Sequence, residues 1–188
     1  GEAICDPCCG SGGFLIKAFE YVRSKIEREI QREKEKIKQE YYTETYEKLS
    51  EAEKRKVDEK VNNFFWQLNE ELNINNEKSR IRELSYDCIF GTDANPRMGR
   101  TAKMNMIMHG DGHGGVHHND GLLNVNGIFE NRFDVIITNP PFGARVEKSL
   151  KITEADKYTD QERIRKYQHR YGQDYDRALQ QVNNNIGK

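Results

Sequence analysis

Residues 4–14 read Ile-Cys-Asp-Pro-Cys-Cys-Gly-Ser-Gly-Gly-Phe, and the expected architecture follows from them. The first residues are typical of the end of a strand, which Asp6 and Pro7 terminate. Four small residues then allow a tight turn close to a ligand: Gly10, Ser11, Gly12 and Gly13. From Phe14 onward apolar residues recur at helical spacing, so a helix follows directly. A strand, a glycine turn and a helix N-terminus form the place where doubly wound α/β folds hold a nucleotide-like cofactor.

The composition limits the class of protein. A chain of 188 residues can bury a core, and we expect one partial catalytic domain over residues 1–188. The formal net charge of −1 argues against a strongly basic nucleic-acid-binding arm, so a DNA partner would need phosphate contacts from elsewhere. No apolar run approaches the roughly 20 residues of a membrane span. Because the chain opens at Gly1 without a methionine and closes in a polar stretch, we expect it to be a piece of a larger protein.

The cysteines and histidines predict neither a disulfide framework nor a metal site. Three of the four cysteines crowd the glycine turn, and no signal peptide is visible, so we expect reduced thiols in a cytoplasmic protein. Cys5 and Cys8 form a Cys-x-x-Cys pair, but no second pair has ligand spacing. The histidines at 109, 113, 117 and 118 fit no common metal site. We expect no bound metal.

A long charged segment follows the glycine turn. Apolar spacing predicts one helix over residues 14–42, and Ser50 with Glu53 is a capping-box signal for a second helix. Between Arg23 and Lys60 there are twelve Lys or Arg and eleven Asp or Glu, a balance that favours solvated, ion-paired helices over a DNA-binding arm. We therefore expect residues 23–82 to be a helical hairpin inserted into an α/β core.

The core is expected to resume with two further strands and a helix. Cys88, Ile89 and Phe90 predict a short buried strand that ends in an acid, Asp93. Asn95-Pro96 begins a helix that stops near Gly110, and a short strand over residues 116–118 leads to Asn119-Asp120-Gly121.

Residues 133–138 are the best strand in the chain by composition, and we expect this strand to be buried. After it come Asn139-Pro140-Pro141-Phe142 and then a polar loop or loosely packed helical segment over 143–188. Alternating strands and helices imply a parallel sheet with helices on both faces.

Three acids are expected at or just beyond the carboxyl ends of successive strands: Asp6, Asp93 and Asp120. Ligands of open α/β sheets bind along that edge. An acid in the place of Asp93 is suited to accept hydrogen bonds from two ribose hydroxyls, while the alternative is a plain helix cap before Pro96. For Asp120 a turn aspartate before Gly121 and a ligand role are both open.

Asn139-Pro140-Pro141-Phe142 is the more specific signal. Two prolines fix the backbone and hold two acceptors, the Asn139 side-chain oxygen and the Pro140 carbonyl, in a rigid arrangement. Two acceptors placed in this way suit a planar exocyclic amine, and Phe142 offers an aromatic face on which a base can stack. The alternative is an ordinary proline-rich turn, which does not account for the glycine turn upstream.

These motifs resemble the N6-adenine DNA methyltransferases, and most closely the modification (M) subunit of type I restriction–modification systems. Asp6 to Phe14 and Asn139 to Phe142 carry the resemblance. Residues 91–96 and 104–110, and the stretch after Phe142, are also similar to that subunit. The span of about eighty residues between the first two motifs departs from the roughly 30 of a plain βαβ unit, and Asp93 stands where the family usually has Glu.

The resemblance implies a Rossmann-like, S-adenosylmethionine-dependent core. It implies that Asp6 and the turn from Pro7 to Phe14 hold the methionine part of the cofactor, and that Asp93 with Ala94 holds the ribose. Asp120 would hold the adenine amine of the cofactor. Asn139, Pro140 and Pro141 would grip the N6 amine of a target adenine flipped out of the duplex, with Phe142 stacked on it.

The resemblance also implies partners and leaves alternatives open. Double-stranded DNA, a specificity (S) subunit and a restriction (R) subunit are the implied partners, in a bacterial or archaeal cytoplasm, and we expect these residues alone to be inactive. The Asn-Pro-Pro-aromatic motif also serves methylation of glutamine side chains, which present a similar planar amine. A non-catalytic binding or assembly module is a further alternative, favoured by the long hairpin.

Overall fold

The computed structural model describes residues 1–112, 115–121, 123, 128–129, 131–143 and 151–187. Within them a parallel sheet of four strands has the order β3-β2-β1-β4. Its members are β1 (Ile4–Asp6), β2 (Ile89–Asp93), β3 (Gly115–His118) and β4 (Val135–Ile136). Each neighbouring pair runs parallel. The α/β fold with a parallel sheet is therefore confirmed.

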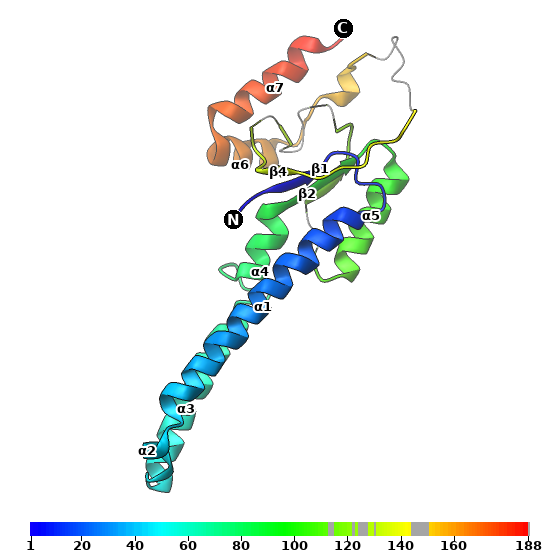
Figure 1. Ribbon diagram of the computed structural model, residues 1–188. Helices are drawn as coiled ribbons and strands as arrows, with labels where there is room; N and C mark the ends of the chain where they lie inside the picture. The colour runs from blue at the N-terminus through cyan, green and yellow to red at the C-terminus, as the bar shows by residue number, and fades with distance from the viewer. Residues whose placement is uncertain (113–114, 122, 124–127, 130, 144–150, 188) are drawn as a thin grey trace.

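Helices lie on both faces of the sheet (Figure 1). On one face are α1 (Gly13–Tyr41) and α5 (Pro96–Met108), and on the other are α6 (Gln161–Tyr171) and α7 (Gln173–Asn185). Strand β2 serves both layers because successive side chains of a strand point to opposite faces. Ile89 packs with Leu15 and Phe19 of α1, whereas the next residue, Phe90, packs with Cys5 and Ile128.

Helix α1 continues well past the sheet, and α3 (Glu51–Glu70) returns alongside it (Figure 1). A four-residue helix, α2 (Glu44–Glu47), lies at the tip. The Ser50 amide donates to Glu53 Oε2 at 2.9 Å, so the predicted capping box begins α3. Ile30 and Val61 are buried between the two helices. That this hairpin is an insertion into the domain stays a prediction. Although α1 has 29 residues, no helix in the described part of the chain is apolar enough to span a membrane.

The return to the sheet differs in detail from the prediction. A short helix, α4 (Arg80–Glu83), leads into a π-helical turn, η1 (Leu84–Cys88), and β2 starts only at Ile89. Cys88 therefore ends this turn and does not begin the strand. Asn95 caps α5, as predicted, and its side chain accepts from the Arg97 amide at 2.9 Å.

The prediction of a long buried strand over residues 133–138 was wrong. β4 comprises Val135 and Ile136 only, and their side chains are 36% and 56% exposed. The reason is position: β4 is the edge strand of the described sheet and pairs with β1 alone. The apolar composition correctly indicated a strand, but it could not indicate that one side of the strand would face solvent.

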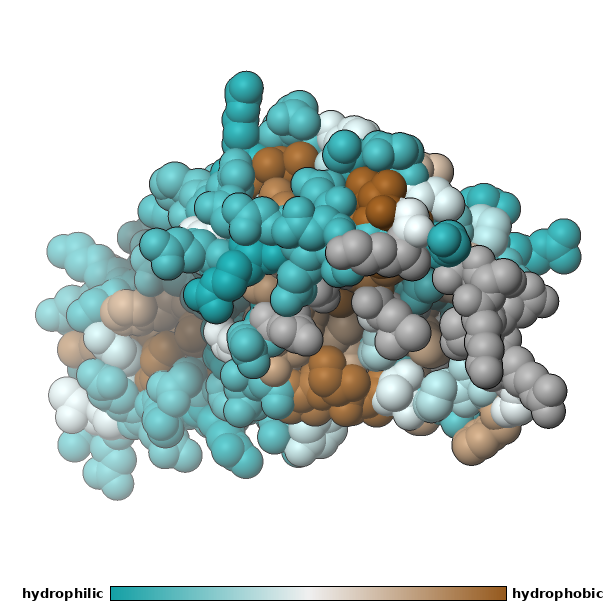
Figure 2. All heavy atoms as spheres, turned by 90° about the horizontal axis from the view of Figure 1, so that it is seen from above, coloured by the Kyte–Doolittle hydropathy of each residue, from teal (hydrophilic) through white to brown (hydrophobic). Residues whose placement is uncertain are grey.

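The polar C-terminal segment forms ordered helices. After a short 3₁₀ turn, η2 (Glu154–Asp156), α6 and α7 pack on each other around Tyr175, which is fully buried. The guanidinium of Arg132 lies 3.9 Å from the ring centre of Phe90 and 4.8 Å from that of Tyr171, so it joins these helices to the sheet. Figure 2 looks down on this side and shows a mostly hydrophilic surface with a few apolar patches.

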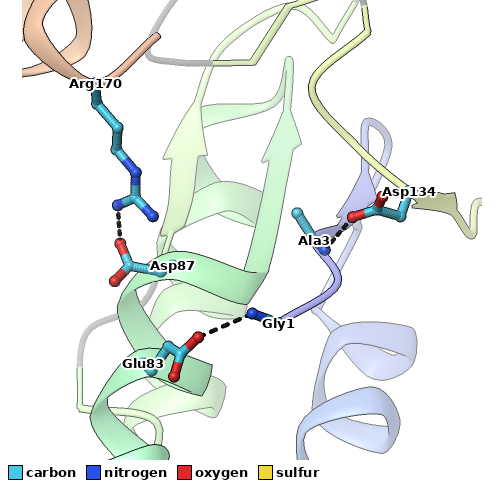
Figure 3. Close-up of polar contacts among 6 residues, drawn as sticks. All are labelled: Gly1, Ala3, Glu83, Asp87, Asp134 and Arg170. Atoms are coloured by element: carbon cyan, nitrogen blue, oxygen red, sulfur yellow. Dashed lines mark hydrogen bonds and ion pairs between the residues drawn. The ribbon is translucent and has the colours of Figure 1, made fainter. Parts of the chain in front are cut away.

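Polar contacts at the amino ends of the strands complete this attachment (Figure 3). Arg170 of α6 forms an ion pair with Asp87, which lies two residues before β2. The Ala3 amide donates to Asp134 Oδ2 at 2.7 Å, which fixes the start of β4 against β1. The Gly1 amino group lies 2.9 Å from Glu83 Oε1. These contacts lie at the amino ends of the strands, whereas the predicted site lies at their carboxyl ends.

Candidate functional site

The three predicted acids lie at one edge of the sheet. Asp6 is the last residue of β1, Asp93 is the last residue of β2, and Asp120 follows β3 by two residues. Because these strands are parallel neighbours, their carboxyl ends meet at the same edge. Figure 1 shows the loop from β1 to α1, the start of α5 and the segment after β4 at this end of the sheet.

Asp93 joins two of the loops at this edge. Its Oδ2 atom accepts from the Gly10 amide at 2.9 Å, and its Oδ1 atom accepts from the Asn95 amide at 2.8 Å. The alternative that Asp93 is simply the cap of α5 is wrong, because Asn95 is the capping residue. Each carboxylate oxygen has two acceptor positions, so Asp93 can hold the glycine turn and still accept hydroxyl groups.

The glycine turn presents bare backbone at this edge. Gly10 (φ 53°) and Gly12 (φ 87°) have left-handed backbone angles, which explains the need for glycine. A Cβ built on Gly10 or Gly13 would have no described atom within 4 Å, so an open space faces both residues. Gly12 supplies no side-chain cap and the first turn of α1 has no acidic residue. This helix N-terminus can therefore receive an anionic group.

The loop around Asp120 packs against both other loops. A Cβ on Gly121 would lie 2.1 Å from the Pro7 carbonyl oxygen, so the two backbones are in close contact. The Asn119 amide donates to the Asp93 carbonyl at 3.1 Å, and His118 Nε2 lies 3.1 Å from the Ala94 carbonyl oxygen. The residues predicted to form a cofactor site are thus brought together by contacts among three loops.

Some supporting residues were missed by sequence reasoning. Asn105 of α5 donates from its side-chain amide to the Ser11 carbonyl at 2.9 Å. Thr92 is fully buried, donates from its hydroxyl to the Asn119 carbonyl at 2.7 Å, and accepts from the Cys9 amide at 2.9 Å through its carbonyl. A signal for Asn105 was available, since it is a polar residue within the run Met-Asn-Met. Thr92 lies within residues 91–96, which carry part of the resemblance, but nothing in the sequence indicated its contacts.

Asp6 is a buried acid at the centre of this edge. It is 2% exposed, and its Oδ1 atom accepts from the Cys8 amide at 3.0 Å. Burial raises the pKa of this carboxyl; the hydrogen bonds from the Cys8 amide and the Thr138 side chain lower it, and the charge of Asp93 raises it further.

The neighbouring thiols are protonated groups. All four cysteines are free, and burial raises the pKa of Cys5 and of Cys9 to about 12. A thiol with such a pKa is a poor nucleophile at neutral pH. Among the described residues no three or more His, Cys, Asp or Glu side chains gather in a way that could hold a metal ion.

The segment Asn139–Phe142 lies beside Asp6 but makes little contact with the body. The Ile137 amide donates to the Cys5 carbonyl at 3.0 Å, which continues the pairing of β4 with β1. The Thr138 side chain forms a hydrogen bond with the Asp6 carboxyl and thereby lowers its pKa. All four motif residues are exposed, and Phe142 is 92% exposed. The structure brings this motif to the edge of the three acids without packing it against them.

Residues 1–169 match the model of a protein family described as RMKL-like, methyltransferase domain (UPF0020). The chain belongs to this family. The matched residues include the whole edge described above and extend into α6. Membership of the RMKL-like family agrees with the Rossmann-like parallel sheet and identifies the chain as a methyltransferase domain, with no particular substrate. No solved structure matches the chain.

Proposed function

We propose that this methyltransferase domain transfers a methyl group from S-adenosylmethionine to the N6 amine of adenine in DNA, as the modification subunit of a type I restriction–modification system. One observation carries the proposal: β4 delivers Asn139 to Phe142 to the same sheet edge as Asp6, Asp93 and the glycine turn. A cofactor edge next to a rigid amine-binding motif is the combination that such a reaction requires.

The residues at the edge fit S-adenosylmethionine. The open space beside Gly10 and Gly13 and the uncapped start of α1 suit its methionine carboxylate. The free acceptor positions of Asp93 suit its ribose hydroxyls, and the partly buried Asp120 suits its adenine amine. When bound, this cofactor supplies an electrophilic methyl group on a positively charged sulfur. The buried carboxylate of Asp6 is a favourable neighbour for such a charge.

The Asn139 motif then positions the acceptor. The side-chain oxygen of Asn139 and the carbonyl of Pro140 would each accept a hydrogen bond from the target amine, which would leave the nitrogen lone pair facing the cofactor edge. The two prolines keep these acceptors in place without packing, and the exposed ring of Phe142 is free to stack on a base. Positioning and electrostatic stabilisation would provide the catalysis, and the methylated nitrogen would lose its extra proton to water, so no strong base is needed.

The proposed partners come from the resemblance to type I modification subunits, and the charge of the chain is a reason to expect that other subunits contact DNA. With a net charge of −1, this domain supplies little of the phosphate affinity that a DNA enzyme needs. A specificity subunit would recognise the DNA sequence, and a restriction subunit would complete the system. We expect residues 1–188 alone to be inactive on DNA.

Labelled methyl transfer by the full-length protein with its partner subunits tests the proposal. The acceptors are duplex DNA, RNA and a glutamine-containing peptide, each offered with radiolabelled S-adenosylmethionine. The proposal predicts label in DNA, recovered as N6-methyladenine after digestion. Label in the peptide alone would support glutamine methylation, and transfer that Asn139→Ala leaves unchanged would exclude the assigned role of the motif.

A further inference from the structure

Helix α5 begins at the site and carries only positive charge. Between Pro96 and Met108 it has three basic residues and no acidic residue: Arg97, Arg100 and Lys103. Gly99, Ala102 and Met106 are buried against the body, whereas Arg97 and Arg100 are exposed. Met104 and Met108, farther along, are 64% and 77% exposed. The charged part of the outward surface is thus confined to the first turns, next to the cofactor edge.

The α5 cations lie on a helix that has no acidic residue of its own to pair with. On the hairpin, several cations pair with acids three or four residues away, such as Arg23 with Glu27 and Lys36 with Glu33. On α6, Arg163 pairs with Asp160 and Arg170 pairs with Asp87. No ion pair of the described residues involves α5. Its positive charge is therefore available to a negatively charged partner.

The distance between the start of α5 and the Asn139 motif matches the spacing of phosphates along DNA. Helix α5 follows β2, and the motif follows β4; in the order β3-β2-β1-β4 these strands are two positions apart. Neighbouring strands are separated by about 4.8 Å, so the start of α5 lies roughly 10 Å from the motif along the edge. Phosphates of one DNA strand follow each other at about 3.4 Å along the helix axis, so that distance corresponds to about three nucleotides.

We propose that Arg97 and Arg100 bind backbone phosphates of duplex DNA on the side of the flipped base nearest the cofactor edge. The inference rests on the proposed function and adds a contact surface to it. Such contacts would position the duplex without reading its sequence. They would also give the methyltransferase domain a DNA contact of its own despite its net negative charge.

The test is the salt dependence of DNA binding by the full-length protein with its partner subunits. Fluorescence anisotropy of a labelled 40-base-pair duplex is measured across a series of KCl concentrations for the wild type and for the double variant Arg97→Gln, Arg100→Gln. Each lost phosphate contact lowers the slope of log K against log salt by about 0.9, so we expect a reduction of about 2 and at least about tenfold weaker binding at low salt.

A matched control removes the same charge far from the site. Arg32 and Arg55 are exposed on α1 and α3, and Arg32→Gln with Arg55→Gln should leave the slope unchanged. S-adenosylmethionine titration and thermal unfolding report whether each variant is folded. Equal slopes for wild type, variant and control would overturn the inference while leaving DNA methylation intact. A wild type that shows no salt-dependent binding to the duplex would overturn the inference and the proposed function together.

Discussion

The two parts of the sheet edge are built in opposite ways. The loops around Asp6, Asp93 and Asp120 are joined by backbone and side-chain hydrogen bonds, and Gly121 allows its backbone to approach that of Pro7 closely. The Asn139–Phe142 segment is exposed and depends on two prolines for its shape. The conformation of the first part therefore depends on hydrogen bonds and packing. The conformation of the second part depends on the restricted backbone angles of its two prolines. Substitutions in the first part should therefore change stability together with binding, and substitutions in the second should change turnover alone.

The largest expected effect is on turnover and comes from Asn139→Ala. Loss of one positioned acceptor should lower methyl transfer by about 10²–10³-fold, while thermal stability stays unchanged because the side chain is exposed. Single-turnover transfer and thermal unfolding of the full-length protein measure the two quantities. Asn62→Ala, an exposed change on α3, is the control. A large loss of stability in Asn139→Ala would contradict the separation between the two parts.

The next effect comes from the contact between Gly121 and Pro7. Gly121→Ala would force apart two backbones that now touch, and we expect the free energy of unfolding to fall by about 1–3 kcal/mol, with weaker cofactor binding. Gly13→Ala is the control, because its Cβ would meet open space in the first turn of α1. Urea unfolding checks both variants. Equal stability of the two would show that the close approach is unimportant.

A smaller effect is expected for Asn105→Ala. This change removes the hydrogen bond to the Ser11 carbonyl, so cofactor affinity should fall about fivefold, corresponding to about 1 kcal/mol. Calorimetric titration of S-adenosylmethionine measures it, again with Asn62→Ala as the control. Unchanged affinity would mean that the glycine turn is held without Asn105.

The smallest effect is a dependence of stability on pH. Burial raises the pKa of Asp6, so the folded state binds the carboxyl proton more tightly than the unfolded state does. Stability is therefore lost as the pH rises from the usual pKa of an aspartate to the higher pKa that Asp6 has in the folded state. Asp6→Asn should therefore unfold at a slightly higher temperature than wild type at neutral pH, an advantage that disappears in acid. A variant less stable than wild type at neutral pH would contradict this sign.

The sequence predicted the parts of the fold that depend on local signals. The glycine turn, the capping box at Ser50 and the cap at Asn95 all lie where the pattern placed them. The exposure of β4 could not be predicted, because it depends on which strands are its neighbours and not on its own composition. The buried cluster around Tyr175 was also missed, since its aromatic residues are dispersed among charges and meet only after α6 and α7 pack.

In the site, too, some features could be predicted from the sequence and others depend on tertiary contacts. Asp6, Asp93 and Asp120 could be placed at one edge because parallel strands bring their carboxyl ends together. The contacts of Thr92 and Asn105 could not, because each contact joins residues that are far apart in the sequence. The roles assigned to the acids and to Asn139–Phe142 stay predictions.

Calorimetric titration of S-adenosylmethionine tests the central claim most directly. It compares wild type, Asp93→Ala and Asn139→Ala, first in residues 1–188 and then in the full-length protein. The account predicts saturable binding by wild type, about 10–100-fold weaker binding by Asp93→Ala, and wild-type affinity in Asn139→Ala. Binding by Asp93→Ala with wild-type affinity would contradict it, and so would a folded full-length protein that does not bind S-adenosylmethionine.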